Sequence, residues 1–192
     1  MDVRYMPEDS ILDPEEDEQL IKGLEQYADV AGIGGHPKYI WKSILDNDYV
    51  SEEDLDIMDG IPFKNSDQLG ALYIGYDSST ITRKFMSLTG FLVRNYIDAR
   101  YLNKAALMQS ISDNEEVEGK VFFCPDFYVR EKKGEKNSIL PQWKRDILFS
   151  FFLECQAESR DIILAVSNWE AAEEHYGPEI AKFIEDNFLE VE

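Results

Sequence analysis

The sequence has few of the residues from which metal sites and nucleophilic sites are most often built. Its 192 residues include only two cysteines and two histidines. Cys124 and Cys155 lie among apolar residues at a spacing that fits no metal-ligand motif, and His36 and His175 are isolated from each other. We therefore predict no metal site, no histidine-based catalytic site, and a reduced, intracellular protein.

Long apolar runs are also missing. No stretch approaches the roughly 18 apolar residues of a membrane-spanning helix, and the N-terminus carries an acid where a secretory signal would have its apolar core. Apolar residues nevertheless make up 44% of the chain and aromatic residues 12%, which is enough for a packed core. These features predict a folded cytoplasmic protein without membrane contact.

Basic residues are scarce. The 19 lysines and arginines stand against 39 acids, which gives a net charge of −20. Residues 1–60 hold 17 acids and 4 bases, net −13. A surface this negative repels phosphate backbones, so direct nucleic-acid binding is disfavoured as the main activity. Three interpretations remain: a solubilising face, a docking surface for a basic protein partner, or a mimic of nucleic-acid charge. The lysine-rich segment 130–138 is interrupted by acids and is interpreted as a solvated loop.

The pattern of the chain changes near residue 60. Residues 1–60 are predicted to form an acidic N-terminal extension with a short helix near 18–27, and residues 46–59 within it a solvated acidic surface. Residues 61–192 are predicted to form an α/β domain. Its apolar runs predict strands near 71–74, 99–102, 121–124, 162–167 and 188–191, with helices at 82–99, at 104–111 and from Pro141 and Pro178. This alternation is typical of a three-layer fold, a mostly parallel sheet with helices on both faces.

The first predicted strand runs into a glycine and then a helix, which is the context of a phosphate-binding loop. That loop has the pattern Gly-x-x-x-x-Gly-Lys-Ser/Thr, whose backbone amides and lysine hold the phosphates. In residues 75–82, Gly75 and Thr82 match the first glycine and the final hydroxyl. Thr80 replaces the second glycine and Ile81 replaces the lysine. Asp77 adds a negative charge where phosphates would lie.

The order of these features resembles the ATPase domain of bacterial replicative-helicase loaders and the related transposition helper ATPases, within the AAA+ class of P-loop NTPases. The resemblance covers residues 70–192 and is carried by segments in matching order: 71–75, 91–96, 100–107, 122–126, 162–168 and 177–180. Residues 31–39 also resemble the family's lead-in. The resemblance implies that Asp126 stands in the metal-site strand and that Asn168 matches the asparagine that polarises the attacking water.

The catalytic residues implied by this resemblance are incomplete. The lysine is Ile81, the metal-site pair of acids keeps only Asp126, and the family's two arginines have no counterpart in the aligned helices. Because such enzymes act mainly by neutralising charge in the transition state, we expect no ATP hydrolysis and no bound cofactor. Without ATP, we expect Asn168 to cap the segment that follows it.

A protein that keeps this fold but lacks the residues for ATP hydrolysis is expected to act through its surface. The first interpretation is a catalytically inactive accessory subunit that binds a protein of a replication, recombination or transposition complex, of cellular or phage origin. An active AAA+ ATPase or a replicative helicase is the implied partner. The alternative is an acidic decoy that occupies the nucleic-acid groove of a DNA- or RNA-binding enzyme. An enzyme with a site of unrecognised type is a third interpretation.

The principal partner contact is expected in the first 60 residues, because most of the negative charge lies there beside several aromatic side chains. Acids steer a basic partner over a distance, and aromatics supply contact energy once it is docked. The nominated residues are three aromatics and three acids expected to be exposed: Tyr39, Trp41, Tyr49, Glu52, Glu53 and Asp54. In the competing interpretation the acids only keep the chain soluble and the aromatics complete the core.

Overall fold

A five-stranded parallel sheet forms the centre of the molecule. The computed structural model describes residues 6–46, 48–60, 68–113, 115, 117–129 and 139–191. The strands are β1 (Gly70–Ile74), β2 (Ala99–Tyr101), β3 (Val121–Tyr128), β4 (Asp161–Val166) and β5 (Phe188–Val191). They lie in the order β2-β3-β4-β1-β5, and each neighbouring pair is parallel. The predicted strands and the parallel sheet are confirmed.

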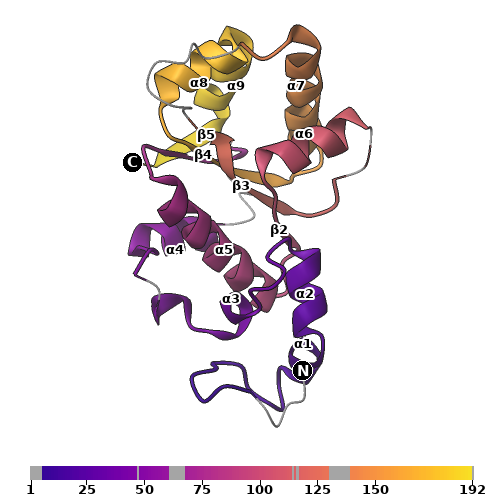
Figure 1. Cartoon of the computed structure of the whole chain (residues 1–192), viewed down its shortest axis with the longest axis vertical. Coiled ribbons are helices and arrows are strands. Elements are labelled where there is room, and N and C mark those ends of the chain that lie inside the picture. Colours follow the sequence, from indigo (N-terminus) through magenta and orange to yellow (C-terminus); the bar gives the residue numbers. More distant parts are fainter. Residues whose placement is uncertain are drawn as a thin grey trace.

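Helices cover both faces of this sheet, as Figure 1 shows. One face carries α5 (Ser78–Arg94) together with the shorter α3 (Lys38–Trp41) and α4 (Glu52–Asp59), and the opposite face carries α6 (Lys104–Ser112), α7 (Gln142–Ala157), α8 (Trp169–Tyr176) and α9 (Pro178–Asn187). The remaining elements are α1 (Glu18–Lys22), α2 (Leu24–Val30) and the 3-10 helix η2 (Ile44–Asp46). The three-layer α/β fold is therefore confirmed.

The strands are apolar on both faces because each face meets a helical layer. In β1, Ala71 and Tyr73 face the layer of α5, and Leu72 faces the layer of α7 and α9. In β4, Ile163 likewise faces α5, and Leu164 faces the other side. Side chains of a strand alternate between its two faces, so a sheet buried on both sides needs continuous apolar runs. That requirement explains why these strands could be predicted from the sequence.

Some predicted boundaries were wrong. The helix expected at 82–99 runs from Ser78 to Arg94, because Asp77 caps its first turn and Tyr96, with φ of 58°, stands just beyond its end. The segment 46–59, expected as a solvated acidic surface, contains α4, and Ile57 and Met58 within it are buried. The two cysteines are buried, as their apolar surroundings suggested.

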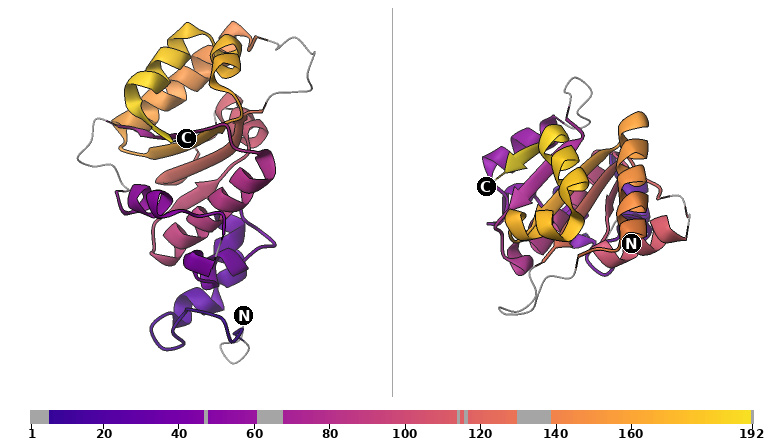
Figure 2. Two further views of the ribbon diagram at one scale, coloured as in Figure 1. Left: turned by 90° about the vertical axis from the view of Figure 1, so that its left-hand side faces the viewer. Right: turned by 90° about the horizontal axis from the view of Figure 1, so that it is seen from above.

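The first 60 residues pack onto the sheet's α5 side and share its core. Leu20, Ile21, Ile33 and Ile40 are fully buried in the same cluster as Phe85 of α5. Figure 2 shows these indigo and purple segments stacked beyond α5, at the end of the molecule opposite α8 and α9. Apart from Asp54, the described acidic residues of this region lie on the outside of a layer with an apolar interior.

A buried ion pair joins α4 to α5. The Asp54 carboxylate lies 2.6 Å from Lys84 Nζ, and the two side chains are 1% and 4% exposed. Tyr73 of β1 donates its hydroxyl to the same carboxylate at 2.8 Å. Asp54 also accepts from the backbone N–H and hydroxyl of Ser51, which completes a capping box at the start of α4. Burial, with the Asp54 charge adding to it, raises the pKa of Tyr73 well above its usual value.

This ion pair corrects the expectation that Asp54 is an exposed, partner-facing acid. The side chain points into the interior, where an unpaired charge would be very unfavourable. Its place in the acidic run 52–54 reflects the turn of α4, which directs one of three neighbouring acids inward and leaves Glu52 and Glu53 exposed.

We predict that Asp54→Asn and Lys84→Met will each lower the free energy of unfolding by about 3–5 kcal/mol, because each leaves its partner's charge buried and unpaired. The double variant should lose clearly less than the sum of the two, since neither charge then remains. Urea unfolding of a double-mutant cycle measures this, with the exposed Glu52→Gln as a control expected within about 0.5 kcal/mol of wild type. Additive losses would contradict a direct ion pair.

Candidate functional site at the carboxyl ends of the strands

The chain connections mark a switch point between β1 and β4. From β1 the chain passes through α5 to the β2 edge, and from β4 it passes through α8 and α9 on the opposite face to β5. In open α/β sheets, ligands bind outside the carboxyl ends of the strands at such a point. Gly75 and Asn168 stand there, and the Gly75 N–H donates to the Val166 carbonyl at 3.0 Å. The residues nominated from the resemblance thus meet at one edge of the sheet.

The loop after β1 turns on Gly75 and ends at the cap of α5. Gly75 has a φ of 82°, in the left-handed region that favours glycine. Two residues later, Asp77 Oδ1 accepts the backbone N–H groups of Ser79 and Thr80, both at 3.0 Å, and the Ser79 hydroxyl at 2.7 Å. Hydrogen bonding from the Thr80 and Ser79 side chains, together with their backbone N–H groups, holds the pKa of Asp77 well below its usual value. The Asp77 carboxylate therefore accepts hydrogen bonds from backbone N–H groups of the kind that bind phosphate in a P-loop.

The other loop positions lie in packed surroundings. Ile81, at the position of the P-loop lysine, is 2% exposed and belongs to the core on the α5 face. The Thr82 side chain hydrogen-bonds Tyr101 of β2, which moderates the rise in the pKa of Tyr101 that burial causes. Thr80 is half-buried in the first turn of α5. The side chains at the lysine and hydroxyl positions thus make internal contacts.

Asp126 and Asn168 also bind helix starts. Asp126 Oδ1 accepts the backbone N–H of Lys104, the first residue of α6, at 2.6 Å. Asn168 Oδ1 accepts the backbone N–H of Ala171 at 2.8 Å and caps α8, as expected from the sequence. The polar acceptors after β1 and after β4 therefore bind backbone N–H groups in the first turn of the helix that follows their strand, and Asp126 within β3 binds the first N–H of α6, the helix that follows the neighbouring β2. Such groups otherwise lack partners.

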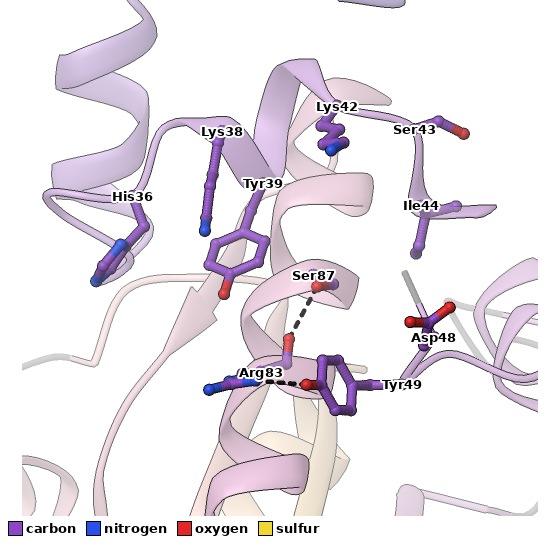
Figure 3. Close-up of a pocket in the computed structure, with 10 residues that line it drawn as sticks. All are labelled: His36, Lys38, Tyr39, Lys42, Ser43, Ile44, Asp48, Tyr49, Arg83 and Ser87. Carbon is purple, nitrogen blue, oxygen red and sulfur yellow. Dashed lines mark hydrogen bonds between the residues drawn. The ribbon is translucent and has the colours of Figure 1, made fainter. Parts of the chain in front are cut away.

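The nominated aromatics occupy a different place, on the flank of α5. Tyr39 and Tyr49 line a cavity of about 540 Å³ with Arg83 and other residues, shown in Figure 3. Trp41 is half-buried and packs against the core instead. Tyr39 comes close because Gly90 lets α3 approach α5: a Cβ at Gly90 would lie 2.2 Å from the Tyr39 carbonyl oxygen. The structure thus brings two of the three aromatics together.

Sequence reasoning missed the charge of this cavity. The side chains that line it include Lys38, Lys42 and Arg83, with Asp48 as the acid among them. The sequence predicts one surface shared by these aromatics and the acids Glu52 and Glu53. In the structure, the charged neighbours of Tyr39 and Tyr49 in the cavity are mainly basic. Lys38 and Lys42 are four residues apart, a signal for a shared helical face, but the approach of Arg83 depends on tertiary packing. The lysine-rich segment 130–138 lies outside the described residues.

The described part of the chain bears on two features that the sequence predicts to be absent: a membrane-spanning helix and a metal site. Within residues 6–46, 48–60, 68–113, 115, 117–129 and 139–191, no helix is long and apolar enough to cross a membrane. In the same ranges, no three His, Cys, Asp or Glu side chains are grouped so that they could hold a metal ion.

Comparison with known proteins supports the fold. No protein-family model matches the chain, and no curated protein sequence matches it. Among solved structures, AMPPCP-bound DnaA from Aquifex aeolicus is similar, with a TM-score of 0.55 and 12% identity over 81% of this chain and 50% of that one. The chain thus spans about half the length of that protein's chain. The likeness shows an AAA+-like fold, and the resemblance to helicase loaders in particular stays a prediction.

We predict that Asp77→Ala will lower the melting temperature at pH 7, because α5 loses its cap, and that Asp77→Asn will lower it less, because asparagine also caps helices. The pKa of Asp77 is depressed in the folded state, so its contribution is present above about pH 4 and is lost as the pH falls further. Melting curves from pH 2 to 7 should show the gap between wild type and Asp77→Ala narrowing in acid. Equal stability at pH 7 would contradict the capping role.

Proposed function

We propose that this protein is a catalytically inactive AAA+-like module that binds another protein of a replication, recombination or transposition complex. An active AAA+ ATPase or a replicative helicase is the partner that best fits the resemblance in sequence. The module would act by presenting an ATPase-like face and an acidic N-terminal face to that partner, without turning over nucleotide itself.

One observation carries the proposal: Asp77, Asp126 and Asn168 all accept backbone N–H groups at the starts of helices. A nucleotide site needs the loop amides for phosphate and needs a lysine near the β- and γ-phosphates. Here the amides of Ser79 and Thr80 hold Asp77, and the lysine position is the buried Ile81. The carboxylate of Asp77 would also repel a phosphate that approached these amides.

The fold itself supports the class of complex. One similar solved structure is AMPPCP-bound DnaA. Modules of one fold can keep their shapes for assembly after their chemistry is lost, but a fold alone does not specify a function. The proposal therefore rests on the strand-end residues, and the likeness to DnaA directs it toward replication proteins.

We predict no ATP turnover above background. Phosphate release should be the same with and without Mg²⁺, and the same in wild type and Asp126→Ala, because no charge-neutralising lysine stands at the loop. A malachite-green assay with the purified chain measures it. Magnesium-dependent release that Asp126→Ala abolishes would contradict the proposal and would make Asp126 a catalytic residue.

We predict that reversing the exposed acids Glu52 and Glu53 to lysine, with Asp54 unchanged, will slow association with a co-purified AAA+ partner by about tenfold at low salt. The melting temperature should change little, since exposed charges contribute little to stability. Glu173→Lys/Glu174→Lys on α8 is the matched control for total charge, because these acids are also exposed. Biolayer interferometry measures the rates. Equal slowing by both pairs would show only the effect of net charge.

A second candidate function, the acidic decoy, is favoured by the net charge of −20. A decoy binds its target in competition with DNA and loses affinity steeply with salt. An accessory subunit co-purifies with an intact ATPase in a fixed stoichiometry, with DNA present or absent. Measuring the complex by size-exclusion chromatography with light scattering, with and without duplex DNA, separates the two functions.

A further inference from the structure

A basic cavity lies in a strongly acidic chain. The cavity on the flank of α5 encloses about 540 Å³, within the range of roughly 300–1,000 Å³ in which proteins hold small ligands. Its wall is formed by α3 and the segment through η2 to residue 49 on one side and by α5 on the other. It is distinct from the strand-end site, because Arg83 stands a full turn beyond the Asp77 cap of α5.

Two of the three cations in this cavity, Lys38 and Arg83, are held by the two aromatic rings. The Arg83 guanidinium lies 5.2 Å from the centre of the Tyr49 ring and donates to the Tyr49 hydroxyl. Lys38 Nζ lies 5.2 Å from the centre of the Tyr39 ring. In Figure 3, Lys38 lies beside the Tyr39 ring, and a dashed line joins Arg83 to the Tyr49 hydroxyl. Cation–π contacts of this kind restrain flexible basic side chains, which reduces the ordering needed when an anion binds.

The charge inside the cavity is positive even though the chain is negative. Three cationic side chains, Lys38, Lys42 and Arg83, face the single acid Asp48 among the lining residues. Lys42 is partly neutralised by Asp9 at 3.6 Å. A guanidinium has five N–H donors in a planar fork that matches the oxygens of a phosphate, and the bond to Tyr49 uses one of its nitrogen atoms. The donor set therefore suits a phosphate group.

The size of the ligand follows from the field around the cavity. A polyanion such as single-stranded DNA must bring many phosphates across a surface of net charge −20, and screening is incomplete within about 8 Å at physiological salt. A small anion meets mainly the cations beside it. We infer that the cavity bounded by Lys38, Arg83 and the rings of Tyr39 and Tyr49 binds a small phosphorylated compound.

Inorganic pyrophosphate is the test probe, titrated calorimetrically into the 192-residue chain at low and physiological salt. We expect saturable binding that Lys38→Ala and Arg83→Ala each weaken by about tenfold, the loss of one charge-assisted contact. Both side chains are exposed, so the variants should keep the wild-type melting temperature. Lys182→Ala on α9, another exposed lysine, is the matched control and should bind as wild type does.

Three results would overturn the inference. The first is the absence of saturable pyrophosphate binding by the wild-type chain. The second is binding that Asp77→Ala alters and Arg83→Ala does not, which would assign the anion to the strand-end site. The third is an oligothymidylate that binds more tightly than pyrophosphate and loses affinity in Lys38→Ala and Arg83→Ala, which would make the cavity part of a nucleic-acid surface.

Discussion

The packing of the N-terminal region against the sheet depends on one buried ion pair. Asp54 meets Lys84 at 2.6 Å and Tyr73 at 2.8 Å with almost no exposure to water. Separating α4 from α5 would leave one of these charges in an apolar interior, which is far more unfavourable than losing an ordinary contact. The pair therefore fixes α4 on α5, and Tyr73 extends the connection into β1, the strand that leads to Gly75. The acidic region and the strand-end site belong to one packed unit.

At the strand-end site, the same residue types that serve catalysis in the resembled family serve helix capping. An aspartate or asparagine at the end of a parallel strand stands beside the N–H groups of the next helix, because the strand's carboxyl end is where that helix begins. In a site that holds a lysine and a nucleotide, such acceptor side chains can face the ligand instead of the helix. In this chain Asp77 and Asn168 instead bind amides of the helix that follows their own strand, and Asp126 within β3 binds the first amide of α6, the helix that follows the neighbouring β2. Helix capping alone is enough to hold these side chains in place.

The sheet could be predicted from the sequence because burial on both faces demands apolar runs such as 162–166. The apolar pattern predicts the start of α5 too late, at residue 82. Asp77 carries a second signal besides its charge, because aspartate favours the position just before a helix. The capping box of Ser51 and Asp54 was also visible as a Ser-x-x-Asp pattern. The Asp54–Lys84 pair was not, since it joins residues 30 apart through packing that no local pattern encodes.

Net charge is a poor guide to any one site on this molecule, because charges act mainly over distances comparable to the screening length. The acids of residues 1–60 suggested an acidic docking face around Tyr39 and Tyr49. Tertiary packing instead places these rings against Lys38 and Arg83, since Gly90 admits α3 closely against α5. The remaining acids, which we propose attract a basic partner, would also discourage extended polyanions from a cavity whose own charge is positive. Selectivity for small anions would follow from that contrast between the local and the overall field.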